Sequence, residues 1–358
     1  MKLNIKKDKL SDILNLQFGV FNPLKKYVSK IDFVSIVNNH RLKNGKFFPF
    51  PIYFNVDLFE YEKIKAEKGI NLFFKSKKVC ELKINSIYKL NKIEIGKKLF
   101  KTNDLNHPGF EYFVNSGDYF IDGVIKNFNF EIMKTLNFTP PSTIKSEILK
   151  YNLKSIAGFH TRNAPHKGHQ WIHLYGLKNC EAILIQPMIG QFRTNEYHDK
   201  VIIETNYKLV KDIYKKKNIL FGLFNSYPKY GGPSEALLHA LVRKNYGCTH
   251  FLVGRDHAGV KDYYKKYESQ NLCKKNEKLL NIKILKFKEP FLCKNCKKII
   301  NNKNDCCGKN IKKEISGTFI RNLLIKKKKI PYYLMHKKIS KLLNIKLLIN
   351  KKKLSNKI

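Results

Sequence analysis

Long apolar segments are missing from this 358-residue chain, which excludes one large class of proteins. No run of about 18 uncharged apolar residues occurs, so we expect no membrane-spanning helix. The N-terminal residues 1–8 lack an apolar stretch and a small-residue cleavage site, so no secretory signal is predicted. The expected protein is therefore soluble and cytoplasmic, with no membrane partner.

Arginine, alanine and acidic residues are also scarce. The chain has 70 Lys+Arg against 28 Asp+Glu, a formal net charge of +42, yet only six residues are arginine and only seven are alanine. Lysine, asparagine, isoleucine, phenylalanine and tyrosine, whose codons are A/T-rich, are abundant. Two interpretations are open: a base-composition bias acting on tolerant surface positions, or a basic surface for nucleic acid. The lysines are spread along the chain, which favours the first and predicts no dedicated nucleic-acid partner.

The apolar content is sufficient for packed cores, at 43% hydrophobic and 13% aromatic residues. A chain of this length predicts two or three domains. Residues 1 to about 145 read as strands and turns, with an edge strand in the aromatic, proline-containing stretch 47–56 and a second strand over 78–90. The segment 139–142 is a predicted boundary, and Ser142 is expected to cap a following helix.

Strands and helices alternate after residue 155. Apolar segments predict strands, and amphipathic segments predict helices from about 168 and over 234–246. The predicted strands are 156–159, 182–185, 218–224 and 250–253. This alternation is typical of a doubly wound α/β fold with a parallel sheet, in which ligands bind beyond the carboxyl ends of the strands.

A Gly/Pro/His turn follows the first of these strands, within residues 158–169. His166 and His169 are three residues apart, so both can lie on one side of the first helical turn. A helix N-terminus attracts anions, and Gly168 permits close backbone approach. The His-x-Gly-His pattern after a strand is typical of nucleotidylyl transferases that cleave ATP between its α and β phosphates. The alternative is a pair of surface histidines.

Three further segments carry glycines or helix caps beside charged residues. Gly254-Arg255-Asp256-His257-Ala258-Gly259 follows a predicted strand directly, and its alternative is a plain connecting turn. The segment 229–240 contains a glycine pair before Pro233, which is typical of a helix start. In 315–321, Ser316 is expected to cap a helix that carries Thr318 and Arg321, which predicts a second phosphate-binding turn.

Taken in order, these motifs resemble the ATP sulfurylase (sulfate adenylyltransferase) family. The family has Gln-Thr-Arg-Asn, His-x-x-His, Gly-Arg-Asp-His-Ala-Gly and Ile-Ser-Gly-Thr. The matching segments of this chain are 160–163, 166–169, 254–259 and 315–318, with further likeness at 18–24, 107–109 and 232–236. The resemblance therefore spans nearly the whole chain. It departs from the pattern at His160, where the family usually has glutamine, so sulfate binding is expected to weaken as pH rises through the titration of His160.

The resemblance implies a fold and a reaction. It predicts a PUA-like, β-rich N-terminal domain (1–145), a Rossmann-like nucleotidylyl-transferase α/β domain (146–322) and a small C-terminal helical segment (323–358). The implied reaction converts ATP and sulfate to adenosine 5′-phosphosulfate and pyrophosphate by in-line attack of sulfate on the α-phosphorus. The same site can run in reverse to make ATP in sulfur oxidation. Mg²⁺ would accompany ATP and pyrophosphate, and family members commonly form homo-oligomers.

The resemblance also assigns residues, which lie in the turns after the predicted strands. The implied catalytic residues are Thr161, Arg162, Asn163, His166 and His169. The implied sulfate-binding groups are His160, Arg162 and the backbone of Ala258. The implied ATP-binding residues are Thr161, Asn163, Gly254, Arg255, Asp256 and His257.

The eight cysteines divide into two sets. Four are scattered, which favours buried thiols in a reducing compartment: Cys80, Cys180, Cys248 and Cys273. The others form a Cys-x-x-Cys knuckle and an adjacent pair within the loop 293–307: Cys293, Cys296, Cys306 and Cys307. This spacing predicts a structural zinc site, with free thiols as the alternative. Some family members use a histidine as the last ligand; none follows nearby here, so Cys307 is the predicted replacement.

Three other functions compete. Another His-x-Gly-His adenylyltransferase would act on a phosphate ester, and sulfate-dependent pyrophosphate release would distinguish it. An RNA-binding protein would use the PUA-like domain, the zinc knuckle and the charge of +42, but it leaves both phosphate-binding turns unexplained. A class I tRNA synthetase would need a Lys-Met-Ser-Lys-Ser motif, which the sequence lacks.

Overall fold

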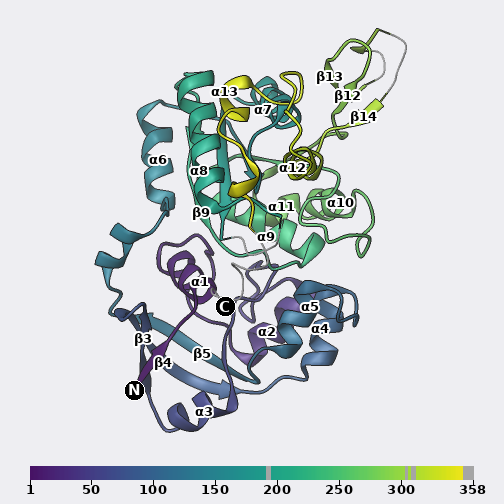
Figure 1. Ribbon diagram of the computed structural model, residues 1–358. Coiled ribbons are helices and arrows are strands. Elements are labelled where there is room, and N and C mark those ends of the chain that lie inside the picture. Colours follow the sequence, from purple (N-terminus) through teal and green to yellow (C-terminus); the bar gives the residue numbers. More distant parts are fainter. Residues whose placement is uncertain (191–194, 303–304, 308–311, 350–358) are drawn as a thin grey trace. The chain divides into compact units, whose positions relative to one another are not determined.

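The computed structural model describes residues 1–190, 195–302, 305–307 and 312–349 (Figure 1). The chain forms two compact units. Unit 1 contains Met1–Pro141, Ser226–Tyr246 and Arg255–Ile284, and unit 2 contains Ser142–Asn225, Gly247–Gly254 and Leu285–Ile358. The end of the predicted C-terminal segment, 350–358, lies outside the described residues. The predicted domain limits at 145 and 322 stay a prediction.

Unit 1 is built on a five-stranded sheet in the order β1-β3-β4-β5-β2. Its strands are β1 (Lys2–Asn4), β2 (Phe54–Val56), β3 (Gly69–Phe74), β4 (Lys77–Tyr88) and β5 (Tyr119–Lys126). β1 pairs with β3 in parallel, and the other neighbours are antiparallel. The predicted edge strand is confirmed at β2 but is shorter, because only residues 54–56 join the sheet. The predicted strand over 78–90 is confirmed as β4.

The interpretation of residues 1–145 as strands and turns alone is wrong, because helices surround this sheet. They are α1 (Lys7–Gln17), α2 (Lys30–Asn39), α3 (Leu58–Ile64), α4 (Lys92–Phe100), α5 (Pro108–Asn115) and the 3₁₀ helix η1 (Phe130–Thr135). Side-chain hydrogen bonds at the N-terminus stabilise the start of several of these helices. Ser29 accepts a hydrogen bond from the Asp32 N–H, and Asp57 and Glu60 form a reciprocal capping box. The later segments of unit 1 add α9 (Gly232–Asn245), α10 (Glu268–Lys275) and α11 (Glu277–Leu280).

Unit 2 contains the predicted parallel sheet, in the order β11-β10-β6-β7-β8. Its strands are β6 (Ile156–Thr161), β7 (Ala182–Ile189), β8 (Ile219–Phe221), β10 (His250–Val253) and the edge strand β11 (Lys283–Lys286), with β9 (Phe224–Asn225) also paired to β7. The pairs β10–β6, β6–β7 and β7–β8 are parallel. Every residue of β7 is buried, as expected for a strand covered on both faces. The doubly wound α/β prediction is confirmed.

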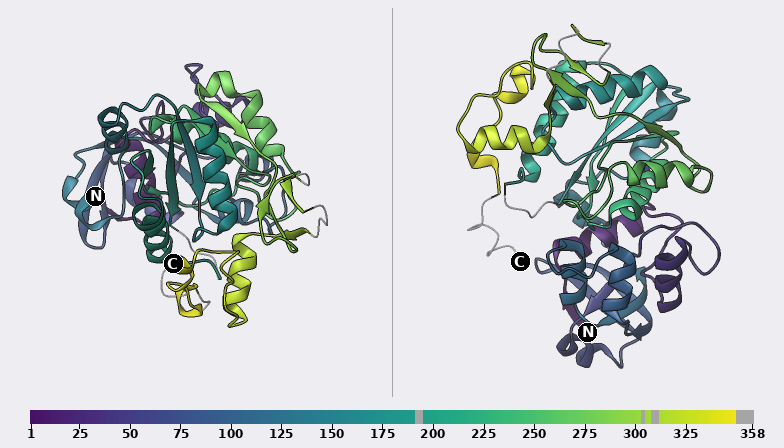
Figure 2. Two further views of the ribbon diagram at one scale, coloured as in Figure 1. Left: turned by 90° about the horizontal axis from the view of Figure 1, so that it is seen from above. Right: turned by 90° about the vertical axis from the view of Figure 1, so that its right-hand side faces the viewer.

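The helices of unit 2 pack on this sheet and on the C-terminal segment (Figure 2). They are α6 (Pro141–Lys150), α7 (Lys167–Asn179), α8 (Asp199–Lys208), the π-helix η2 (Leu209–Tyr214), α12 (Gly317–Ile325), α13 (Lys337–Ser340) and the 3₁₀ helix η4 (Ile345–Leu347). The prediction that Ser142 caps a helix is wrong, since α6 begins at Pro141 and Ser142 lies inside its first turn. An antiparallel bridge between Tyr197 and Leu348 ties the C-terminal segment beside α8.

A small antiparallel sheet, in the order β13-β12-β14, carries part of the predicted zinc-knuckle loop. Its strands are β12 (Phe291–Cys293), β13 (Ile299–Ile300) and β14 (Lys312–Glu314). Residues 303–304 of that loop lie outside the described residues. Among the described helices, none is long and apolar enough to cross a bilayer.

Candidate active site

The point at which the strand order of unit 2 reverses lies between β6 and β10. These strands are parallel neighbours, with His250 opposite Ala157 and Phe251 opposite Gly158. β6 ends at Thr161 and β10 ends at Val253, one residue before Gly254. In open α/β sheets this is where a crevice for ligands forms. The turn 162–166 and Gly254 therefore begin at the edge of the sheet where a ligand is expected.

His166 and His169 shape the start of α7. His166 is the N-cap, and its Nδ1 accepts a hydrogen bond of 3.3 Å from the His169 N–H. The two imidazole rings stack with centroids 3.8 Å apart and planes 19° from parallel. A Cβ at Gly168 would lie 3.0 Å from the His166 ring, closer than side chains normally pack. Glycine at 168 therefore lets the His166 ring fold against the helix start.

Burial keeps both imidazoles neutral. Burial, aided by repulsion from His169, His173 and Arg321, lowers the pKa of His166 well below its ordinary 6.5. Burial lowers the pKa of His169 to about 4. Because Nδ1 of His166 accepts a backbone N–H, the neutral ring carries its proton on Nε2. His166 is thus arranged as a hydrogen-bond donor at a helix N-terminus.

Asn163 connects the turn after β6 with a segment more than 150 residues further along the chain. Its Oδ1 accepts a hydrogen bond from Nη1 of Arg321. Its backbone carbonyl accepts from Nδ2 of Asn206 at 3.1 Å, and its N–H donates to Oγ1 of Thr161 at 3.1 Å. A Cβ at Gly317 would lie 2.4 Å from Oδ1 of Asn163. The Asn163 side chain can occupy this position only because residue 317 is glycine.

The start of α12 lies beside the start of α7. Ser316 caps α12, as predicted, by accepting a hydrogen bond of 3.1 Å from the Phe319 N–H. Nη2 of Arg321 donates to Oγ1 of Thr318 at 3.0 Å, which holds the guanidinium along the first turn. A Cβ at Gly168 of α7 would lie 3.2 Å from Cγ2 of Ile315. Two helix N-termini and an arginine therefore gather in one place, an arrangement suited to an anion.

The turn that follows Gly254 belongs to unit 1 from Arg255 onward. Ala258 has a φ of +58°, in the left-handed region that non-glycine residues seldom adopt. A Cβ at Gly259 would lie 1.7 Å from Oδ1 of Asp256, so that carboxylate folds over the glycine. Oγ of Ser269 in α10 donates to the His257 carbonyl at 2.7 Å. Such strained turns, held by their surroundings, recur where backbone groups bind ligands.

The glycine pair before α9 is held by a buried carboxylate. Glu235, only 3% exposed, accepts hydrogen bonds from the N–H groups of Lys229 at 2.8 Å and Gly231 at 3.1 Å. Nζ of Lys229 in turn forms an ion pair with both oxygens of Asp12 in α1, at 2.9 and 3.0 Å. Pro233 lies in the first turn of α9, as predicted. The loop is thus fixed at both ends within unit 1.

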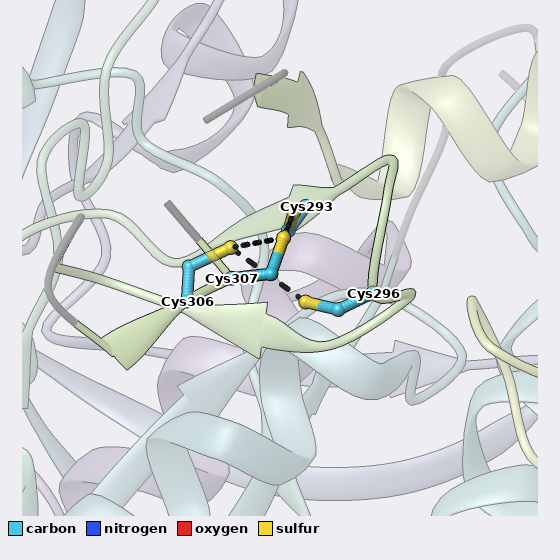
Figure 3. Close-up of side chains that lie close together, drawn as sticks. All are labelled: Cys293, Cys296, Cys306 and Cys307. Atoms are coloured by element: carbon cyan, nitrogen blue, oxygen red, sulfur yellow. Dashed lines mark hydrogen bonds between the residues drawn. The ribbon is translucent and has the colours of Figure 1, made fainter. Parts of the chain in front are cut away.

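Four cysteine sulfurs gather beside the small sheet (Figure 3). Cys293, Cys296, Cys306 and Cys307 place their Sγ atoms within 4.8 Å of one another. The closest separations are 3.6 Å for the pairs 296–306 and 306–307, and 3.9 Å for 293–307. Four sulfurs around a tetrahedral zinc with Zn–S of about 2.3 Å are separated by about 3.8 Å. The cluster therefore has the dimensions of a metal site.

The structure distributes the predicted site residues over both units. In unit 2, the end of β6 carries His160 and Thr161, the turn after it carries Arg162 and Asn163, and the start of α7 carries His166 and His169. The turn after Gly254 carries, in unit 1, Arg255, Asp256, His257 and Ala258. The site residues implied by the family resemblance did not include Arg321 and Asn206, which both donate hydrogen bonds to Asn163. Arg321 had a signal, since it is one of only six arginines and lies in the predicted second phosphate-binding turn; Asn206 had none.

The switch-point site and the paired helix starts define an α/β protein arranged to bind an anionic ligand. Two family models match the chain: ATP-sulfurylase over residues 136–345 and PUA-like domain over residues 1–130. The chain belongs to the ATP-sulfurylase family. The predicted combination of a PUA-like N-terminal domain with a parallel α/β domain is thereby confirmed.

Curated relatives extend over almost the whole chain. It is 32% identical to the sulfate adenylyltransferase of Ignicoccus hospitalis, over 92% of this chain and 86% of the relative. It is 33% identical to that of Pyrococcus abyssi, over 94% of this chain and 88% of the relative. Among solved structures it resembles the hexameric APS kinase from Thiobacillus denitrificans, with a TM-score of 0.73 and 13% identity. This chain covers 62% of that one, less than two thirds, and the likeness concerns the fold alone.

Proposed function

We propose that this chain is a sulfate adenylyltransferase, which converts ATP and sulfate to adenosine 5′-phosphosulfate and pyrophosphate. Membership of the ATP-sulfurylase family and the relatives named sulfate adenylyltransferase support the reaction. The structural observation that carries it is the junction at Asn163, where the turn after β6 meets the start of α12 through Arg321 and Gly317. That junction brings two helix N-termini together with the guanidinium of Arg321, an arrangement that suits a polyphosphate.

The chemistry needs positioning more than proton transfer. Sulfate is a weak nucleophile with no proton to remove at neutral pH, so a general base contributes little. The rate must come from aligning a sulfate oxygen with the α-phosphorus and from stabilising charge on the departing pyrophosphate. Arg162 is proposed to hold sulfate, with His160 and the backbone of Ala258. Thr161 and Asn163 are proposed to hold the phosphates.

The neutral histidines have a defined part in this scheme. His166 donates from Nε2, because its Nδ1 is occupied by the backbone of His169. A donor fixed in this way needs no reorientation when charge develops on the transferring or leaving phosphate. Full positive charge comes instead from arginine, since burial holds the pKa of both imidazoles low. Gly254, Arg255, Asp256 and His257 are proposed to bind the rest of the nucleotide, with Mg²⁺ accompanying ATP.

The cysteine cluster is proposed to hold a structural zinc ion. Four thiolates at tetrahedral spacing fit Zn²⁺, which favours sulfur ligands and closed four-coordinate sites. Cys293 ends β12, and the chain returns through β14 to Ser316, the cap of α12. A metal there would fix the loop that delivers Ser316 and Arg321. Assembly into homo-oligomers, a cytoplasmic location and operation in the ATP-forming direction stay predictions.

Sulfate-dependent pyrophosphate release from ATP and Mg²⁺ tests the proposal against the other adenylyltransferase function. We expect release with sulfate and with selenate, and no release when a phosphate ester replaces them. Release with a phosphate ester and none with sulfate would establish the alternative enzyme instead.

A further inference from the structure

A line of buried titratable side chains in unit 1 leads from α9 to the turn 255–259. Glu235 and His239 are one helical turn apart and are 3% and 4% exposed. Nε2 of His239 lies 3.6 Å from Oε1 of Glu235. Nδ1 of the same ring lies 3.0 Å from Nε2 of His257, a partly buried residue. A carboxylate, an imidazole and a second imidazole therefore lie in series, and the two imidazoles share a hydrogen bond.

Electrostatic attraction and hydrogen bonding together favour one placement of the protons along this line. At 3.6 Å the contact between Nε2 of His239 and Oε1 of Glu235 is longer than a hydrogen bond, but the negative carboxylate favours the tautomer of the neutral His239 ring that has its proton on Nε2. Its Nδ1 is then an acceptor, and Nε2 of His257 must be the donor across the 3.0 Å contact. With Nε2 protonated, Nδ1 of His257 is an acceptor in the neutral ring and becomes a donor once the ring is protonated. Only the protonated ring can donate to an anion.

We propose that His239 and Glu235 are positioning residues that hold His257 with its proton on Nε2 and favour its doubly protonated form, which presents Nδ1–H to an anionic substrate. Neither residue needs to touch the substrate. The inference rests on the proposed function, in which His257 belongs to the nucleotide-binding turn. It assigns a positioning role to Glu235 and His239, which the family resemblance did not assign to the site.

The surroundings of the line make its geometry rigid. Both oxygens of Glu235 already bind the N–H groups of Lys229 and Gly231, so the carboxylate cannot rotate away. Ser269 of α10 holds the His257 carbonyl. The other charged groups on these elements are Arg243 and Lys244 of α9, Arg255 and Asp256 of the turn, and Glu268, Lys274 and Lys275 of α10. Nη1 of Arg243 donates to the His239 carbonyl at 3.4 Å, and Glu268 forms an ion pair with Lys101. Glu235 is the carboxylate that lies against the His239 ring.

Two substitutions at one position separate the two contacts. In His239→Asn the amide oxygen takes the place of Nδ1, so the acceptor for His257 stays and the link to Glu235 is lost. In His239→Gln the amide reaches toward Glu235, and the acceptor for His257 is lost. Thermal unfolding of both variants measures any structural damage. The matched control is His40→Asn, since the described contact of His40 with α9 is to Ser234, at the start of the helix, and its left-handed φ of 53° suits asparagine.

The kinetic readout is the KM for adenosine 5′-phosphosulfate in ATP formation, measured from pH 6 to 9. We expect His239→Gln to raise KM about tenfold at the low end of this range, as expected for one lost charge-assisted contact, and the difference to shrink at high pH, where the wild-type His257 ring is itself neutral. His239→Asn is expected to retain the wild-type KM at low pH and to lose affinity at a lower pH than wild type. The proposal is overturned if both variants reproduce the wild-type pH profile of KM. It is also overturned if the increase in KM simply follows the decrease in Tm of each variant.

A spectroscopic readout keeps this inference separate from the proposed function. In protein labelled with ¹⁵N-histidine, signals of His257, assigned with His257→Gln, report which ring nitrogen carries the proton without any turnover. A proton on Nε2 in wild type, lost from that position in His239→Gln, supports the positioning role even if no ATP is formed. A neutral His257 ring protonated on Nδ1 would refute it even in an active enzyme.

Discussion

At the scale of single residues, burial decides the chemistry of the helix start. An exposed imidazole, with its ordinary pKa of 6.5, is partly protonated near neutral pH. Burial lowers the pKa of both His166 and His169, and that of His169 to about 4. The stacked rings at 3.8 Å would repel each other if both were charged. The candidate site therefore offers arginine for charge and histidine for directed hydrogen bonds.

The low pKa values predict how stability depends on pH. An unfolded histidine takes up a proton near pH 6.5, whereas folded His169 does so near pH 4, so acid favours the unfolded chain between these values. Stability contributed by the neutral ring is complete above pH 6.5 and is lost as pH falls toward 4. We expect His169→Asn to flatten this part of the curve of Tm against pH, where each kcal/mol corresponds to about 2–4 °C. Parallel curves for variant and wild type would show that His169 is not held neutral.

Residue types and spacing along the chain were sufficient to predict the turn after β6, because a strand followed by Gly, Pro and His has few structural alternatives. The sequence could not reveal the hydrogen bond from Arg321 to Asn163, since these residues are far apart in the chain and meet only in the tertiary fold. The pair Glu235 and His239 did have a signal, because residues four apart on a predicted helix share a face. That signal is weak, because the spacing alone does not show that the two side chains are buried and lie beside His257.

At the scale of elements, the starts of α7 and α12 lie together in the candidate site. The helices within residues 1–135 were missed, although the capping box at Asp57 and Glu60 is visible in the sequence. Aromatic and β-branched residues in α2 favour strands, and packing against the sheet overrides that preference. In unit 2 the predictions succeeded because buried parallel strands are continuous apolar runs, with β7 the clearest case.

Gly317→Ala tests the contact between the two helix starts. Alanine at the first position of α12 should favour the helix by up to about 1 kcal/mol, so unit 2 should remain folded. Its Cβ would displace Asn163, whose Oδ1 lies 2.4 Å from that position. We expect kcat/KM for ATP formation to fall at least tenfold with little change in Tm. The control is Asn322→Ala, an exposed residue of the same helix, and equal activities of the two variants would contradict this account.

Metal analysis tests the cysteine cluster. Purified wild-type protein should contain about one equivalent of zinc, and Cys293→Ser should lose it, since a serine hydroxyl is a poor zinc ligand. The control is Cys273→Ala, a buried thiol on α10 in unit 1 whose pKa is raised by burial to about 12. Less than half an equivalent of zinc in wild type would leave the cluster as free thiols.

At the scale of the whole molecule, the chain passes between its two compact units five times. One of these passages divides the motif 254–259, so that Gly254 belongs to unit 2 and Arg255 to unit 1. Sequence order alone could not predict this, because composition and periodicity report local structure rather than which segments pack together. The family models, by contrast, follow the chain order, with 1–130 matching one domain and 136–345 the other.

The central claim is that the turn after β6 binds an oxyanion in line with a nucleotide phosphate. The most direct test is ATP formation from adenosine 5′-phosphosulfate and pyrophosphate with Mg²⁺, in wild type, in Arg162→Ala and in the control Arg41→Ala, whose exposed guanidinium binds only the Gly45 carbonyl among the contacts described. We predict ATP formation by wild type and Arg41→Ala, and a loss of roughly 10²-fold or more in kcat/KM for Arg162→Ala with an unchanged Tm. Wild-type protein that forms no ATP, or Arg162→Ala as active as wild type, would contradict the account.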